Sequence, residues 1–391
     1  MVIRPLLLGL ITLAAPGCGN QAPPQQTVTY QYAADTSIVS LGVATTDGVL
    51  HVVWVEDNDD HPRAMHGSSS DGGKTWAKPT LIKTGQPPPD RVHRSNDIRV
   101  AARGESLVVV WQTQGSGYGG SGPMVIARSE DGGRHWTAGE PPATVAESPS
   151  HGFFALSANV DGRFHLAWLD SRAGQQGLHH ATSSNGGASW TNAVTVVPAT
   201  CQCCWNTLAH AEERTYLLYR GIAPRDMALA TLERDSTWQL TERVGQFEWH
   251  VDGCPHVGGA LAVQRSVSKR LHALVWTAED AHLGVHHLIG EPTGEGWQLM
   301  DRIGTRDARN TSLASGLDGR LLATWDQSGE DAAVFAAWSE RERFRKVVRL
   351  SHSSHRASHP FAVTTADGGY VFWTAREPKG ASTWFMSRVD P

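Results

Sequence analysis

SSDGGKTW, residues 69–76, recurs as SEDGGRHW at 129–136 and as SSNGGASW at 183–190. In each copy an Asp or Asn side chain can accept hydrogen bonds from the backbone amides of a tight turn, and two glycines permit positive φ. The closing Trp is large enough to pack between neighbouring β-sheets. Three copies in consecutive segments therefore predict a repeated β-unit. A decayed copy, LERDSTW, lies at 232–238, and the three segments after it lack the motif.

Short apolar strands that end in an aromatic residue recur with the same period. They end at Trp54, Trp111, Trp168, Tyr219, Trp276, Trp325 and Trp373, at intervals of 57, 57, 51, 57, 49 and 48 residues. Most of them follow a polar hairpin turn, so each period predicts two strands joined by that turn and then two more. Seven such units predict an all-β propeller of four-stranded blades, with seven blades favoured. Six blades with one miscounted repeat is the alternative.

The segment before the first repeat is expected to close the ring. TVTYQYA, residues 27–33, has the pattern of a lone β-strand, and the last repeat ends without an obvious fourth strand. We therefore expect 27–33 to be the outer strand of the last blade, which removes an open sheet edge. The propeller is predicted to span 35–391, and 19–34 to supply a tether together with this closing strand.

Residues 1–18 have the pattern of a secretory signal peptide. Arg4 precedes an apolar run, 6–15, that is too short to span a bilayer as a mature helix. The segment resembles a bacterial lipoprotein signal, with Gly17 before Cys18, although the two residues before Gly17 depart from that pattern. The resemblance implies export, a lipid on Cys18 and attachment to the cell envelope, at the outer membrane or facing the periplasm. Ordinary cleavage without a lipid is the alternative.

Composition narrows the class of protein. The chain has 391 residues with 40 glycines and 15 tryptophans, which is unlike a disordered sequence. Its formal net charge of −5 gives no indication of nucleic-acid binding. Of its five cysteines, four follow the signal peptide, and export would permit them to form disulfides.

The repeated motif resembles the Asp box of bacterial neuraminidase repeats, which occur in sialidase-like β-propellers. The resemblance covers nearly the whole chain after the signal peptide, and it implies that the boxes lie on the face opposite the usual active site. Sialidases have six blades and use three arginines, a Tyr activated by a Glu, and an Asp acid/base. The arginine–isoleucine–proline motif that supplies the first arginine is absent here. Arg94, Arg220 and Asp97 are weak catalytic candidates, so the sequence leaves open whether the protein is an enzyme.

The crossovers between blades are expected to carry the functional residues, because loops on that face can vary without disturbing the sheets. Two of them, TCQCCWN at 200–206 and WHVDGCPH at 249–256, lead into adjacent blades. We therefore predict one cluster at the mouth of the central pore, made by Cys201, Cys203, Cys204, Cys254 and His256.

Three interpretations of this cluster stay open. Disulfides are favoured, for instance Cys201–Cys204 with Cys203–Cys254, because four thiols in an oxidising compartment can pair completely. A site for copper or zinc is the alternative, with ligands from Cys203, Cys204, Cys254 and His256, and with His151 as a further candidate. Redox catalysis is disfavoured, because the dithiol spacing lacks the helix N-terminus that would lower a thiol pKa.

The sequence thus favours an exported, envelope-anchored propeller that acts as a binding or interaction module, with a carbohydrate or an envelope protein as its partner. A divergent glycoside hydrolase of the sialidase type, acting on anionic sugars, is the first alternative. An envelope protein that binds copper or zinc is the second.

Overall fold

A computed structural model describes most of the chain after the predicted signal peptide. The described residues are 24, 26, 28–33, 36–57, 62–91, 94–234, 236–266, 268–329, 332–352, 355–376 and 380–391. The predicted signal peptide, Cys18 and most of the tether lie outside them. Within the described residues, no helix has both the length and the apolar character needed to cross a membrane.

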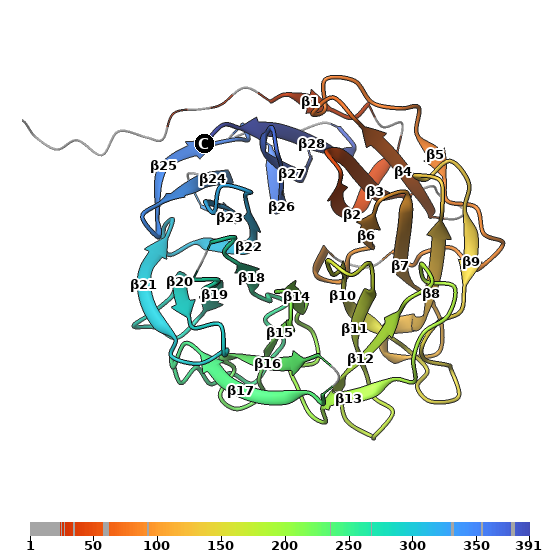
Figure 1. The fold of residues 1–391 in the computed structure, drawn as a ribbon, viewed down its shortest axis with the longest axis horizontal. Coiled ribbons are helices and arrows are strands. Elements are labelled where there is room, and N and C mark those ends of the chain that lie inside the picture. Colours follow the sequence, from red (N-terminus) through yellow and green to blue (C-terminus); the bar gives the residue numbers. More distant parts are fainter. Residues whose placement is uncertain are drawn as a thin grey trace, which may run out of the picture.

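The strands form seven antiparallel four-stranded sheets arranged as a ring (Figure 1). Blade 1 consists of β2 (Ser37–Thr46), β3 (Val49–Asp57), β4 (Arg63–Ser69) and β5 (Thr80–Leu81). Blade 2 consists of β6 (Arg99–Arg103), β7 (Ser106–Gln114), β8 (Ser121–Ser129) and β9 (Thr137–Gly139). Blade 3 consists of β10 (Gly152–Ala158), β11 (Phe164–Asp170), β12 (Gly177–Ser183) and β13 (Val194–Val197).

The second half of the ring repeats this order. Blade 4 consists of β14 (Thr207–His210), β15 (Arg214–Arg220), β16 (Met227–Glu233) and β17 (Gln239–Val244). Blade 5 consists of β18 (Ala260–Val263), β19 (Leu271–Thr277), β20 (Gly284–Gly290) and β21 (Gln298–Ile303). Blade 6 consists of β22 (Ala308–Ser315), β23 (Leu321–Gln327), β24 (Ala333–Glu340) and β25 (Arg343–Arg349). Two single-turn 3-10 helices, η1 (Arg94–Asn96) and η2 (Tyr118–Gly120), lie in connections of the first half.

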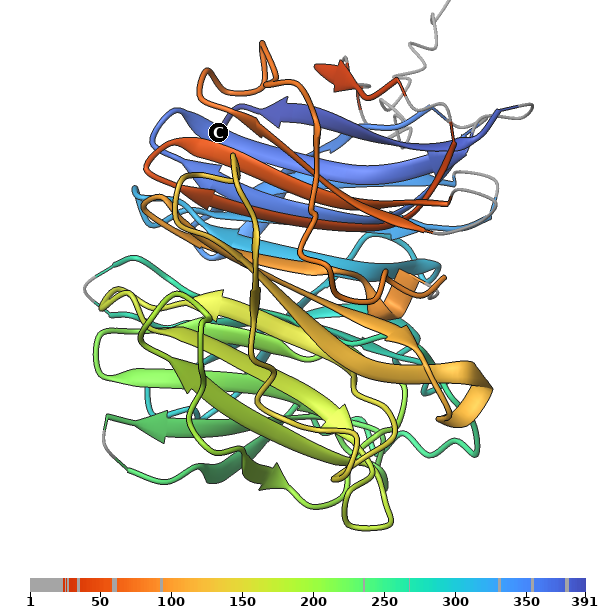
Figure 2. The same cartoon turned by 90° about the vertical axis from the view of Figure 1, so that its right-hand side faces the viewer.

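The seventh blade joins the two ends of the chain. It consists of β26 (Arg356–Thr365), β27 (Gly368–Arg376), β28 (Ser382–Val389) and β1 (Tyr30–Gln31). β1 pairs with β28 in antiparallel register, and the Tyr30 ring packs against Trp76 and Trp384 at centroid distances of 5.3 and 5.2 Å. The predicted seven blades and the closing N-terminal strand are confirmed, and the alternative of six blades is wrong. Figure 2 shows β1 alongside the blade that it completes.

The Asp boxes form the tight turns that the sequence predicts. In blade 2, the Asp131 carboxylate accepts hydrogen bonds from the amides of Arg134 (3.0 Å) and His135 (2.9 Å). Gly133 has φ +90°, and a Cβ there would lie 2.2 Å from the His66 ring of blade 1. The second glycine therefore serves both the turn and the close approach of neighbouring blades.

The Trp of each turn contributes to packing between blades even where the motif has decayed. Trp136 lies edge-on to His66 of the preceding blade, and Trp238 of the decayed box donates its indole N–H to His180. In blade 5, Trp297 donates to the Gly294 carbonyl at 2.9 Å, which parallels the 3.1 Å bond from Trp136 to Gly133. Blade 5 thus keeps the Trp–Gly part of the turn without the Asp.

The four strands of each blade are called A to D from the axis outward, and alternate blades bury a pair of histidines between strands B and C. In blade 1 the rings of His51 and His66 are 3.1 Å apart, nitrogen to nitrogen, and burial lowers the pKa of His51 to about 4 and that of His66 to about 3. Blades 3 and 5 repeat this contact at 3.1 and 3.0 Å, through the pairs His165–His180 and His272–His287. These histidines are neutral packing residues of the core at neutral pH.

Candidate functional site

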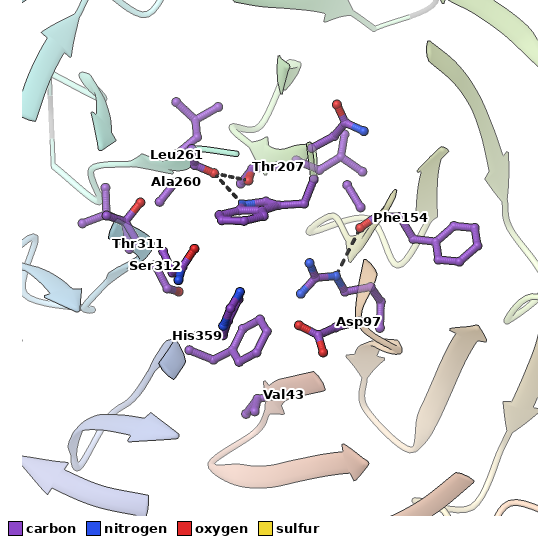
Figure 3. Close-up of a pocket in the computed structure, with 18 of the residues that line it drawn as sticks. Val43, Asp97, Phe154, Thr207, Ala260, Leu261, Thr311, Ser312 and His359 are labelled. Carbon is purple, nitrogen blue, oxygen red and sulfur yellow. Dashed lines mark hydrogen bonds between the residues drawn. The ribbon is translucent and has the colours of Figure 1, made fainter. Parts of the chain in front are cut away.

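The seven innermost strands surround a small cavity on the propeller axis. Its volume is about 180 Å³, and residues from β2, β6, β10, β14, β18, β22 and β26 line it. Figure 3 shows Asp97 and His359 beside the open centre, together with Thr311 and Ser312. Arg94 and Arg99 add positive charge to the lining, and Trp205 adds an aromatic face. The cavity therefore offers polar, charged and aromatic groups within one enclosure.

Arg94 and Asp97 lie at this cavity, where the crossover into blade 2 approaches the axis. The Asp97 carboxylate accepts hydrogen bonds from Ser40 Oγ (3.0 Å), the Leu41 amide (3.2 Å) and Arg94 Nε (2.8 Å). Only 2% of Asp97 is exposed. Arg94 also donates to the His359 carbonyl at 3.4 Å. Both candidates are thus placed at the pore, but Asp97 already joins blades 1 and 2 through its hydrogen bonds.

Arg220, the other catalytic candidate, has a structural environment. Its three guanidinium nitrogens donate to the carbonyls of Val257 (2.9 Å), Arg225 (2.6 Å) and Trp276 (2.9 Å). Its exposed fraction is 1%, and it lies over the Trp249 ring. A substrate carboxylate would have to displace these backbone partners, so the position of Arg220 does not suit substrate binding.

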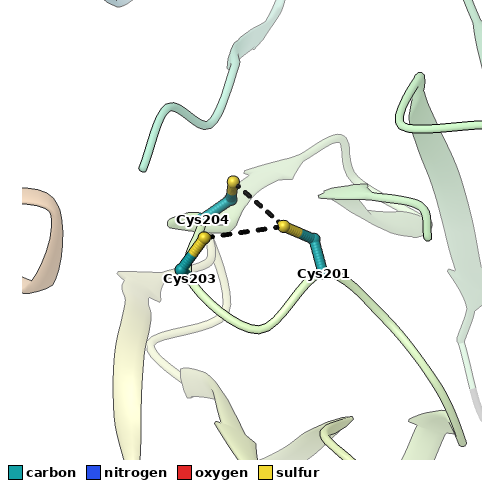
Figure 4. A group of neighbouring side chains, drawn as sticks. All are labelled: Cys201, Cys203 and Cys204. Atoms are coloured by element: carbon teal, nitrogen blue, oxygen red, sulfur yellow. Dashed lines mark hydrogen bonds between the residues drawn. The ribbon is translucent and has the colours of Figure 1, made fainter. Parts of the chain in front are cut away.

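Three cysteines come together where the chain crosses from blade 3 into blade 4 (Figure 4). The Sγ atom of Cys201 lies 3.3 Å from that of Cys204 and 3.8 Å from that of Cys203. All three side chains are buried, and Phe153 packs against them. All four cysteines that the structure describes are free thiols. The favoured disulfides are therefore not present in this structure.

The crossover into blade 5 brings a second group of ligands to the same place. Cys203 Sγ, Cys254 Sγ and a ring nitrogen of His256 all lie within 4.8 Å of one another, as do the sulfurs of Cys201, Cys203 and Cys204. Cys254 is exposed and His256 is half-buried. The structure thus brings together all five residues that the sequence places in one cluster.

Backbone contacts hold the two crossovers in place. The Cys201 amide donates to the Arg220 carbonyl (3.0 Å), and Ser95 Oγ donates to the His256 carbonyl (2.6 Å). His256 has φ +53°, in the left-handed region, which turns the chain sharply after Pro255. Trp205 follows the cysteines and donates its indole N–H to the Gly259 carbonyl at 3.2 Å. Trp205 also lines the axial cavity, so the residue that follows Cys204 in the chain forms part of the cavity wall.

The thiols lie in a positively charged environment. Arg225, from the loop between β15 and β16, donates from Nη1 to Cys201 Sγ at 3.1 Å. Hydrogen bonds from Cys203 and Cys204 lower the pKa of the Cys201 thiol, and the charge of Arg220 lowers it further. Cys201 is thus the member of the cluster that is favoured as a thiolate.

The structure adds two residues that sequence reasoning missed. Arg225 lies 21 residues from Cys204 in the chain, and only the loop path brings it to the cluster.

Asp326 accepts hydrogen bonds from Asn310 Nδ2 (2.9 Å) and the His359 amide (2.8 Å), and burial raises its pKa to about 6. Its position directly after the aromatic residue of strand B was a signal available in the sequence.

One proposed ligand lies apart from the cluster. His151 is fully buried, and its Nδ1 accepts a hydrogen bond from the Met124 amide at 3.2 Å. It belongs to neither group of neighbouring ligand atoms found among the described residues. The inclusion of His151 in the metal site is therefore wrong, because the start of blade 3 directs its ring into the sheet packing.

Comparisons with known proteins agree with this architecture. Residues 56–246 match the BNR repeat-like domain. The chain is also similar in structure to a polysaccharide lyase of family PL25, an ulvan lyase, with a TM-score of 0.63, 9% identity, and coverage of 92% of this chain and 96% of that one. A protein of unknown function from Dyadobacter fermentans gives a TM-score of 0.54 at 12% identity, covering 94% of this chain and 99% of that one.

A sialidase is also among the similar structures. The Trypanosoma rangeli sialidase gives a TM-score of 0.51 at 10% identity, and the alignment covers 90% of this chain but only 54% of that one. A search of curated protein sequences finds no match. At these identities the structural similarities establish a sialidase-like β-propeller fold and leave the chemistry to be argued from the site.

Proposed function

We propose that this propeller is a binding protein whose pore mouth takes up a soft metal ion through its Cys/His cluster, with copper(I) as the ion of best fit. One observation carries the proposal: four thiols and one imidazole from two separate crossovers have their ligand atoms within 4.8 Å of one another in two groups. Thiolate and imidazole are the protein ligands that copper(I) and zinc prefer.

The distances between the sulfur atoms fit ligands of a bound metal ion as well as they fit packed thiols without a metal. In a tetrahedral zinc site with metal–sulfur bonds of about 2.3 Å, neighbouring sulfurs lie about 3.8 Å apart. Cys201 and Cys203 have that separation, and Cys204 is 3.3 Å from Cys201. A structural zinc ion requires four ligands, whereas each group here offers three. Copper(I) accepts low coordination numbers, which is why we favour it over zinc.

Binding of copper(I) to fully reduced protein tests this proposal. Under anaerobic conditions, competition with a chromophoric copper(I) chelator should give tight binding to the native chain. Cys203→Ser should weaken that binding at least tenfold, because Cys203 belongs to both groups. Arg225→Gln, which removes the hydrogen bond to Cys201, should weaken it about 10- to 100-fold.

A matched control and a second chemical measurement separate the interpretations. His135→Ala alters a histidine whose side chain is 89% exposed on the Asp-box face, and it should leave copper binding unchanged. Reduced protein that binds neither copper(I) nor zinc would overturn the proposal. If the native thiols also resisted alkylation until reduction, disulfides would replace the metal as the explanation of the cluster.

We also propose that the protein acts outside the cytoplasm, anchored through a lipid on Cys18. The support is the pattern of residues 1–18 described above. Cys18→Ala should release the protein from the membrane fraction, and a wild-type protein that fractionates as soluble would refute the anchor.

A second candidate function is binding of an anionic sugar at the axial cavity. Arg94, Arg99 and Trp205 line that cavity, and arginine and aromatic rings are groups that suit a charged carbohydrate. One structurally similar protein is an ulvan lyase bound to a sulfated disaccharide unit. Binding of a sulfated or sialylated oligosaccharide, measured by calorimetry, should be lost in Arg94→Ala. Equal binding by the variant would exclude this site.

A further inference from the structure

We infer that the cluster comprises two overlapping metal sites that share Cys203 and together bind two copper(I) ions. The inner site consists of Cys201, Cys203 and Cys204, and the outer site consists of Cys203, Cys254 and His256. This inference rests on the proposed function and specifies how many ions bind and how they exchange with the solvent.

The distances favour two centres over one. Two ligands bound to one ion at about 2.3 Å can be no more than about 4.6 Å apart, whatever the angle between them. The five ligand atoms do not form one group within even 4.8 Å; they form two groups of three that have the Cys203 sulfur in common. A single ion therefore cannot bind all five residues in this arrangement, whereas two ions bridged by the Cys203 thiolate can.

Burial assigns different roles to the two sites. The three cysteines of the inner site are almost fully buried, with exposed fractions of 1%, 4% and 2% for Cys201, Cys203 and Cys204, and Phe153 packs against them. In the outer site Cys254 is exposed and His256 is half-buried. A metal donor in solution can reach the outer ligands first, so the outer site is the entry site and the inner site is the retention site.

Charge balance is consistent with two ions. Four thiolates and a neutral imidazole carry four negative charges, of which two copper(I) ions neutralise two. Arg225 donates a hydrogen bond to Cys201 Sγ. The carbonyl of Arg220 accepts a hydrogen bond from the Cys201 amide, and the guanidinium of Arg220 is buried beside the same two crossovers. These two arginines supply the remaining two positive charges, which lowers the cost of placing the filled cluster in a mostly buried position.

Copper(I) stoichiometry of variants tests the inference. Reduced native protein, titrated anaerobically with copper(I) alone, should bind two ions per chain, and X-ray absorption should give a copper–copper scattering path. Cys254→Ser/His256→Ala should bind one ion that a chelator removes slowly. Cys201→Ser/Cys204→Ser should bind one ion that the same chelator removes at least tenfold faster, because the remaining site includes the exposed Cys254 and the half-buried His256. Circular dichroism and melting curves beside those of His135→Ala establish that each variant is folded.

The outcomes separate this inference from the proposed function. Binding of one ion to the native protein, with no copper–copper path, would overturn the two-site arrangement and leave metal binding intact. Equal chelator removal rates for the two double variants would overturn the division into entry and retention sites. No binding by the reduced native protein would refute the proposed function itself.

Discussion

Mild acid should destabilise this propeller strongly, because its paired histidines are buried in the neutral form. An unfolded histidine has a pKa of about 6.5. In the folded protein burial lowers the pKa of His51, His165 and His287 to about 4 and that of His66 and His272 to about 3. At pH values between the folded and the unfolded pKa of these histidines, the unfolded chain binds more protons than the folded one. The free energy of unfolding therefore falls as the pH decreases through that range.

The magnitude follows from the size of the shifts. For one histidine whose pKa falls from about 6.5 to about 4, linkage predicts a loss of about 2 kcal/mol between pH 7 and pH 5. If each of the five histidines contributes only half of this loss, about 1 kcal/mol, the total loss of unfolding free energy is about 5 kcal/mol. That total is at the lower end of the free energy of unfolding of a typical domain. We therefore expect unfolding to begin between pH 4 and pH 6, before most carboxylates are protonated.

Denaturant unfolding at several pH values, followed by tryptophan fluorescence, measures this effect. The variant His272→Leu/His287→Leu replaces both partners of one buried contact, which keeps its stability cost at pH 7 small. It should lose about 2 kcal/mol of the pH dependence between pH 7 and pH 5, which is the share of two of the five histidines. A native protein equally stable at pH 7 and pH 5, or a double variant with the native slope, would refute the assignment of acid sensitivity to these pairs.

Three further expectations concern the fold and the pore. Asp131→Ala removes the acceptor for the Arg134 and His135 amides, so it should cost about 1–3 kcal/mol in denaturant unfolding. A loss no larger than that of the exposed control Asp280→Ala would contradict the role of the box. Deletion of residues 19–34 removes β1 and should lower the melting temperature clearly; an unchanged curve would mean that β1 does not stabilise the closed ring. The native protein should show little or no hydrolysis of a fluorogenic sialoside, and Arg220→Ala should reduce stability rather than activity; robust turnover abolished by that substitution would reverse this conclusion.

Much of the architecture was predictable because its determinants are local. The period of the strand-B aromatics gives the number of blades, and the hairpin turns give the order of strands within each blade. The lone strand near the N-terminus pairs with β28 as expected, since the last repeat supplies only three strands. One signal was overlooked: each buried histidine pair has a sequence separation of 15 residues, in three alternate blades.

The sequence by itself determined that the cysteines of two crossovers lie side by side, because consecutive blades of a propeller are spatial neighbours. Only the tertiary structure decided what surrounds them. Arg220 matched a role in substrate binding by residue type, yet three backbone carbonyls occupy its guanidinium. Arg225 reaches Cys201 through the path of a loop that no periodicity encodes. The division of the five ligand atoms into two groups that share Cys203 is set by side-chain packing rather than by strand order.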